Sequence, residues 1–284
     1  LLYGVLPEYD VITRSAKVIN TEEDKIRLTK AQAACIDFVH GEFDIISFYG
    51  RHAMERNMQR TPAGHGAFVI GSRRGTSSHQ YNPMMILAEK ETTEDAGTCY
   101  GMSFVYSGGF KAEVEKDQFG QTRMQMGLQE EQFSYPLEKG EEFVIPEVML
   151  TCSSQGLGKL SQNLQRCIRK NLCRGKYKEK VRPVLINSWE AFYFDFTGED
   201  IYHLAEQAKD LGIDMVVLDD GWFGKKYSRD SDRSSLGDWE VSPGKLPDGL
   251  QALIDSCKCA SIRFGIWIEP EMTNTISELY EQHP

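Results

Sequence analysis

Apolar and polar residues alternate in short runs through the first 150 residues. Met124, Met126 and Leu128 alternate with polar residues or glycine, the period of a strand with one buried face. Gly108-Gly109 lies between two such runs and is a hairpin signal. Short strands must bury their apolar faces against another sheet. We therefore predict that residues 1–150 form an antiparallel β-sandwich domain.

The period changes near residue 155. Apolar residues then recur at helical spacing, and Lys and Arg gather toward the end of the run, where the helix dipole favours cations. This stripe comprises Leu157, Leu160, Leu164, Cys167, Ile168 and Leu172. The pattern predicts a linker helix within residues 151–180.

From Val181 onward, short and continuously apolar runs alternate with amphipathic ones. The apolar runs predict strands at residues 183–187, 214–219 and 263–268. Thr197 and Asp200 are spaced to cap the first intervening helix. The predicted stripe of that helix is Ile201, Leu204, Ala205, Ala208 and Leu211, and the stripe of the second is Leu250, Leu253, Ile254 and Cys257. Strands that are apolar throughout and separated by helices predict a parallel sheet buried on both faces.

Charge is distributed unevenly. Residues 181–284 hold 19 acidic and 9 basic residues, so the whole formal charge of −10 lies there. A strongly anionic segment repels phosphate, which argues against nucleic acid, nucleotides and anionic lipid as ligands. A neutral ligand rich in hydroxyl groups fits this segment better.

Several features of the sequence indicate the cellular compartment of the protein. No apolar run approaches the ~18 residues of a membrane-spanning helix, and residues 1–10 lack the features of a signal peptide. The seven cysteines are an odd number without a C-x-x-C pair, and Cys167 and Cys257 fall on apolar helix faces. We therefore expect a cytoplasmic protein with reduced thiols and no membrane partner.

The carboxyl ends of the three predicted parallel strands carry the candidate chemistry, because active sites of (β/α) barrels form at these ends. The side chains are Trp189 after the first strand, Asp219, Asp220 and Trp222 after the second, and Trp267 after the third. Ionised carboxylates accept hydrogen bonds from sugar hydroxyls, and the C–H face of a pyranose stacks on indole. These residues therefore predict a site for a neutral sugar.

Each feature also has an interpretation without a ligand. The Asp pair could cap a strand end and a helix, Trp267 could plug the barrel, and Glu269 and Glu271 could hydrogen-bond only loop backbone. We expect Trp239 to serve packing and His203 to lie at the surface.

The loop SRRGTSSHQYNP raises two further questions. We expect His79 to make a structural hydrogen bond. Arg73 and Arg74 could bind an anion, but a salt link to an acidic loop across the domain junction is the favoured interpretation.

At these residues the sequence resembles a known family. PVLINSWEAFYFDF, VVLDDGWFGK, SSLGDW, LPDGL and FGIWIEPEM resemble the bacterial α-galactosidases of glycoside hydrolase family 36, and SRRGTSSHQYNP and VEKDQFGQTRMQMG are similar to its N-terminal β domain. The resemblance implies a β-sandwich followed by a (β/α)₈ TIM barrel, of which residues 181–284 are the first part. It implies retaining hydrolysis of terminal α-linked galactose from raffinose-type sugars, no cofactor, and a homotetramer.

The resemblance also implies residue roles. Asp219 and Asp220 match the pair that binds the C4 and C6 hydroxyls of galactose, and Trp189 and Trp267 match aromatic walls of the pocket. The family's nucleophile lies in a K-W-D motif after the fourth barrel strand and its acid/base Asp follows the sixth. This sequence ends at Pro284, after the third predicted strand, so the resemblance places neither residue within it. We therefore expect an internal fragment of a larger enzyme, whose catalytic carboxylates lie beyond Pro284 and which is inactive alone.

Other functions remain open. A galactose-binding module would use the same Asp and Trp residues without cleavage. A metal-dependent barrel hydrolase would need His or further oxygen ligands, and no His occurs at the three strand ends, so we expect no metal. An α-N-acetylgalactosaminidase or a raffinose-synthase-like galactosyltransferase would share the motifs.

Overall fold

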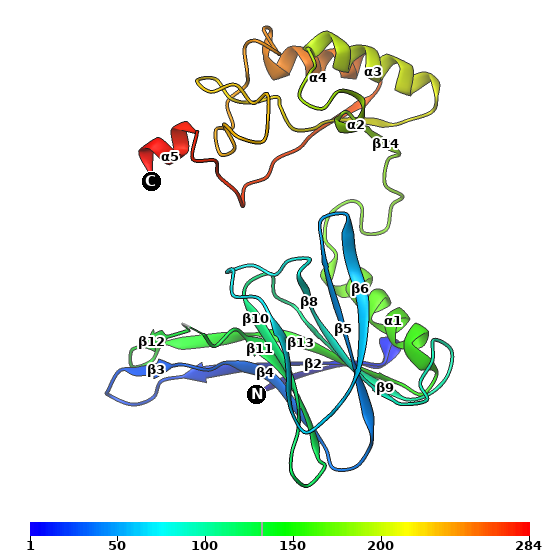
Figure 1. The fold of residues 1–284 in the computed structure, drawn as a ribbon, viewed down its shortest axis with the longest axis vertical. Coiled ribbons are helices and arrows are strands. Elements are labelled where there is room, and N and C mark those ends of the chain that lie inside the picture. The colour runs from blue at the N-terminus through cyan, green and yellow to red at the C-terminus, as the bar shows by residue number, and fades with distance from the viewer. Residues whose placement is uncertain (132) are drawn as a thin grey trace. The chain divides into compact units, whose positions relative to one another are not determined.

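The computed structural model describes residues 1–131 and 133–284, which divide into unit 1, Leu1–Lys178, and unit 2, Glu179–Pro284 (Figure 1). Unit 1 is built from antiparallel strands, as predicted. A seven-stranded sheet has the order β1-β2-β13-β9-β8-β5-β6, a four-stranded sheet has the order β4-β11-β10-β7, and β12 pairs with β3. The strands are β1 (Leu2–Leu6), β2 (Val11–Ile19), β3 (Ile26–Leu28), β4 (Gln32–Phe38), β5 (Phe43–Arg51), β6 (Met54–Pro62), β7 (Gly66–Gly71), β8 (Tyr81–Glu89), β9 (Cys99–Phe104), β10 (Phe110–Lys116), β11 (Thr122–Leu128), β12 (Tyr135–Leu137) and β13 (Glu142–Ser153).

The core of the sandwich lies between the two larger sheets. The alternation read from β11 is confirmed, because Met124, Met126 and Leu128 are all buried. They share one apolar cluster with Phe110 of the same sheet and Met102 of the opposite sheet. Each sheet has one apolar face, and the two apolar faces pack against each other, which is the physical reason for the sandwich.

The hairpin expected at Gly108-Gly109 is wrong. Strand β9 pairs with β8 and β13 in the larger sheet, whereas β10 pairs with β7 and β11 in the smaller one. Both edges of β9 are already occupied, so β10 cannot pair with it. The two glycines instead lie where the chain crosses from one sheet to the other.

The helix predicted after the sandwich is α1 (Gly156–Cys167), continued by a π-helical turn at Ile168–Leu172. Leu160, Leu164 and Cys167 are buried in a cluster with residues of the larger sheet. Figure 1 shows α1 beside β9. This helix is therefore part of the packing of unit 1.

Unit 2 contains the three parallel strands that the sequence predicts. They are β14 (Leu185–Asn187), β15 (Met215–Leu218) and β16 (Arg263–Ile266), in that order across the sheet. Leu185 is opposite Met215, and Met215 is opposite Arg263. The helices are α2 (Trp189–Phe192), α3 (Gly198–Asp210), α4 (Gly249–Cys259) and α5 (Glu278–Gln282). This alternation of strands and helices is the start of a barrel.

The N-terminal end of α3 agrees with the sequence prediction, whereas its C-terminal end differs from it. The capping box is confirmed, because the Thr197 backbone N–H donates to the Asp200 carboxylate at 2.8 Å and the Asp200 N–H donates to Thr197 Oγ1. Leu211, however, is 80% exposed instead of lying on the buried stripe. The helix ends at Asp210, so the chain turns away before Leu211 can continue the stripe.

Candidate functional site

The carboxyl ends of the three parallel strands of unit 2 meet at one sheet edge. The Ser188 N–H donates to Val217 O at 3.0 Å, and the Trp267 N–H donates to Leu218 O at 2.9 Å. These bonds continue the strand ladder one residue beyond the strands. Asp219 lies in the middle of this edge, and its N–H donates to Ser188 Oγ at 3.0 Å.

The structure separates the two carboxylates of the Asp pair. Asp219 is half-buried, and its carboxylate accepts from Asn187 Nδ2 and from the Asp220 N–H at 2.7 Å. Asp220 is buried, and both of its oxygens bind Arg229. No helix begins within residues 221–248, so the interpretation of the pair as a helix cap is wrong. Only Asp219 presents a partly accessible carboxylate.

Arg229 was not among the residues that sequence reasoning selected. Its Nε donates to Asp220 Oδ1 at 2.9 Å and its Nη2 donates to Oδ2 at 2.6 Å. The side chains are 3% and 8% exposed, so the pair is a buried, bidentate ion pair. The only sequence signal was indirect, because a carboxylate buried at a strand end needs a cation.

The tryptophans also differ in how far they are buried. Trp222 is 4% exposed, its indole N–H donates to Trp267 O at 3.0 Å, and its ring lies 6.1 Å from that of Trp239. The expectation that Trp222 binds substrate therefore disagrees with its burial, because a fully packed ring offers no face to a sugar. Trp239 belongs to the same cluster, as expected.

Trp189 and Trp267 keep part of their surface accessible. Trp189 packs edge-on against Tyr193 and Phe194, with ring centroids 5.1 and 4.9 Å apart. Trp267 contacts Trp239 at 6.2 Å and is half-buried. Each ring is therefore held by aromatic neighbours while one part remains available, which is compatible with stacking on a sugar.

Glu269 adds a third carboxylate to this edge. Burial raises its pKa, and the negative charges of Glu271 and Asp220 raise it further, whereas Arg229 opposes the shift. Within the described residues neither Glu269 nor Glu271 makes a hydrogen bond, so the interpretation that they only bind loop backbone is wrong.

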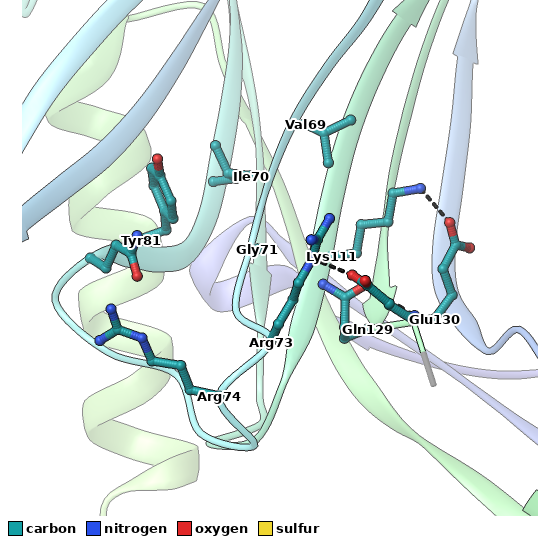
Figure 2. Close-up of a pocket in the computed structure, with 11 residues that line it drawn as sticks. Val69, Ile70, Gly71, Arg73, Arg74, Tyr81, Lys111, Gln129 and Glu130 are labelled. Carbon is teal, nitrogen blue, oxygen red and sulfur yellow. Dashed lines mark hydrogen bonds and ion pairs between the residues drawn. The ribbon is translucent and has the colours of Figure 1, made fainter. Parts of the chain in front are cut away.

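The loop between β7 and β8 lines a separate cavity of about 680 Å³ in unit 1. Figure 2 shows Arg73 on the side of Gln129 and Glu130, and Arg74 on the side of Tyr81. Arg73 pairs with Glu131 of the same unit. The predicted salt link thus exists but does not cross the domain junction, because β7 and β11 both flank β10 and bring their loops together.

Charges in this cavity are mostly neutralised internally. Lys111 pairs with Glu130 at 2.6 Å and with Glu113 at 2.7 Å. His79 is exposed and, among residues 1–131 and 133–284, makes no hydrogen bond, so the structural role expected for it is wrong. His203 is exposed on α3, as expected.

No group of three or more His, Cys, Asp or Glu side chains among the described residues is arranged to hold a metal ion. No helix in the described part of the chain is both long and apolar enough to span a bilayer.

Comparison with known families gives two adjacent matches. Residues 1–138 match the glycosyl hydrolase family 36 N-terminal domain, and residues 142–284 match the Melibiase family. Together these matches cover nearly the whole chain, and the second begins within unit 1 at the start of β13 and continues through unit 2.

Individual relatives agree with the family matches. The chain is 62% identical to the bifunctional α-galactosidase/sucrose kinase AgaSK of Mediterraneibacter gnavus and 45% identical to the α-galactosidase Mel36A of Lactobacillus acidophilus, in both cases over its whole length. It spans 30% and 38% of those proteins. A variant of the α-galactosidase AgaA of Geobacillus stearothermophilus, solved in complex with raffinose, superposes with a TM-score of 0.94 at 45% identity, covering 99% of this chain and 39% of AgaA.

Proposed function

Because this chain belongs to the Melibiase family and carries the N-terminal domain of glycosyl hydrolase family 36, we propose that it forms the galactose-binding part of an α-galactosidase. The observation that carries this proposal is the half-buried carboxylate of Asp219 at an edge shared by Trp189 and Trp267. A carboxylate accepts from sugar hydroxyls, and the indole rings accept the apolar face of the ring.

The charge of unit 2 supports a neutral substrate. The excess of acidic residues in 181–284 disfavours phosphorylated ligands but not galactosides. AgaA is described with raffinose, and another AgaA variant is described with stachyose. We propose galactosides of this type as substrates, with hydrolysis of the terminal α-linked galactose.

The catalytic carboxylates are proposed to lie outside this chain. Retaining hydrolysis uses a nucleophile and an acid/base ~5–5.5 Å apart across the glycosidic bond. Asp220 is bound by Arg229, and Asp219 is adjacent to it on one strand end. Two adjacent carboxylates, one of them bound by an arginine, are poorly placed to act from opposite sides of one glycosidic bond. The chain would then supply substrate binding but not the two reacting groups.

The test uses the full-length protein with its complete catalytic domain. We expect release of nitrophenol from p-nitrophenyl α-galactoside and a large loss of kcat/KM in Asp219→Asn. Glu240→Gln, an exposed carboxylate of the same unit, is the matched control and should retain wild-type kcat/KM. Galactose binding without turnover by the wild-type protein would instead support the binding-module alternative.

The same assay separates the related enzymes. Faster hydrolysis of the α-N-acetylgalactosaminide would support an N-acetylgalactosaminidase, and accumulation of longer galactosides with sucrose as acceptor would support a transferase. We also propose a cytoplasmic homotetramer, for which light scattering of the full-length protein is the direct measurement. A monomer in solution would contradict the tetramer.

A further inference from the structure

Three loops at the candidate site meet at a single buried side chain. The loop after β15 contributes Asp220, the loop after β16 contributes Asn274, and the segment after α2 contributes Phe194; all three contact Arg229. Building on the proposed function, we propose that Arg229 is the positioning residue of the galactoside site, which holds Asp219 and the neighbouring strand ends in their binding geometry through Asp220.

Arg229 joins the second and third strand ends by hydrogen bonds. Its Nη1 donates to Asn274 Oδ1 at 3.1 Å and to Ser234 O at 2.9 Å. Asn274 in turn donates to Asp232 O at 3.0 Å and accepts from the Leu236 N–H at 3.0 Å. The loop 219–236 is therefore fastened at several points to the segment that follows Trp267.

The first strand end joins the same network through aromatic packing and a lysine. The guanidinium carbon of Arg229 lies 5.5 Å from the ring centre of Phe194 and 5.6 Å from that of Phe223. Lys245 Nζ donates to Phe194 O at 2.6 Å and to Arg229 O at 3.2 Å. Phe194 also packs against Trp189. A shift of Arg229 would consequently be transmitted to a proposed wall of the pocket.

Asp219 is linked to this network by its neighbour. The Asp220 N–H donates to Asp219 Oδ1 at 2.7 Å, while the Asp220 carboxylate is held by Arg229 at both oxygens. The side chain of Asp220 is thereby held in place, and its backbone N–H, together with Asn187 Nδ2, holds the carboxylate of Asp219. Arg229 thereby positions Asp220 directly and Asp219 through Asp220.

Lysine cannot replace Arg229 in this arrangement. The planar guanidinium binds both oxygens of Asp220, donates to two further oxygens and lies within 5.6 Å of two ring centres, whereas an ammonium group has three donors around one point. Arg229→Lys keeps the positive charge but loses the fork. The variant therefore tests geometry separately from charge.

The charges around Arg229 make its removal informative. Asp220 at 2.6 Å and Asp232 at 3.8 Å are its acidic partners, and Glu269 and Glu271 lie on the facing loop. Lys245 is directed to Asp230 at 3.0 Å. Removing Arg229 leaves Asp220 buried without its bidentate partner, so Arg229→Met should lower stability as well as activity.

The experiment measures kcat, KM and Tm of the full-length protein on p-nitrophenyl α-galactoside. Arg229→Lys should fold and lose roughly 100-fold in kcat/KM, the scale of a 1 Å misplacement. Arg233→Met is the matched control, because Arg233 lies in the same loop, is exposed and makes no side-chain ion pair within the described residues. It should match the wild type.

A double variant separates positioning from simple stabilisation. Asp220→Asn combined with Arg229→Met removes both charges, so it should recover much of the Tm lost by Arg229→Met while kcat/KM stays low. Recovery of kcat/KM together with Tm would overturn the positioning role, as would wild-type kinetics of Arg229→Lys. If the wild-type protein released no nitrophenol while Arg229→Met still lost Tm, the proposed function would fail and the positioning role with it. Wild-type turnover with Arg229→Lys unaffected would overturn only the inference.

Discussion

The buried polar residues of unit 1 are uncharged, whereas unit 2 buries Asp220, Arg229 and Asp238 among the described residues. In the sandwich, stability comes from apolar faces that cover each other, and the ion pairs of Lys111 and Arg73 stay partly accessible. In unit 2, charges are placed where desolvation is most costly. Buried charges beside the ends of the parallel strands hold the side chains there in a defined position. This difference favours a binding site in unit 2 and a structural role for the sandwich core.

The largest expected effect concerns activity of the separate chain. A polypeptide of residues 1–284 should release no nitrophenol from an α-galactoside, because the nucleophile and the acid/base that retaining hydrolysis needs are proposed to lie outside it. The full-length protein is the positive control. Turnover by the 284-residue polypeptide that disappears when one of its carboxylates is changed would show that a catalytic group lies within this chain.

Asp220→Ala tests the buried charge directly. It leaves Arg229 without its partner, so we expect a loss of about 3–5 kcal/mol in the free energy of unfolding, together with reduced kcat/KM. The measurement is denaturant unfolding of the full-length protein. Asp230→Ala, which removes an exposed partner of Lys245 from the same loop, should change stability little. Equal effects of the two substitutions would remove the distinction between buried and exposed carboxylates.

The sandwich core should respond to loss of volume without a change in chemistry. Met126 is fully buried, and Met126→Ala should lower the free energy of unfolding by about 2–5 kcal/mol. Below the new Tm, KM for the galactoside should remain that of the wild type. Met58→Ala, at an exposed position on β6, is the control. A raised KM in Met126→Ala alone would connect the sandwich core to the site.

The smallest effect is the pH dependence of Glu269. Because its pKa is raised in the folded state, the proton is bound more tightly there than in the unfolded chain, and the stabilising contribution of the neutral acid is lost as pH rises through the folded pKa. Glu269→Gln should therefore raise Tm at pH 7 and have little effect below the ordinary value of 4.5. Glu240→Gln should show no such difference, and a lower Tm of Glu269→Gln at pH 7 would contradict the assignment.

Much of the fold could be predicted because it depends on local periodicity. The alternation around Met124, the capping residues Thr197 and Asp200, and the three parallel strands were all readable from neighbouring residues. The errors at Gly108-Gly109 and Leu211 arose where pairing or helix length depends on distant partners. A glycine pair permits a tight turn but does not determine which sheet the next strand joins.

The sequence by itself determined the order of strands and helices, the acidic character of residues 181–284 and the concentration of Asp and Trp at three strand ends. Only the tertiary structure decided that Asp219 is half-buried while Asp220 binds Arg229, and that Trp222 is packed while Trp189 and Trp267 keep accessible surface. Adjacent residues of one type look equivalent along the chain. Their roles diverge because burial and the approach of a cation nine residues away are set by how the loops fold together.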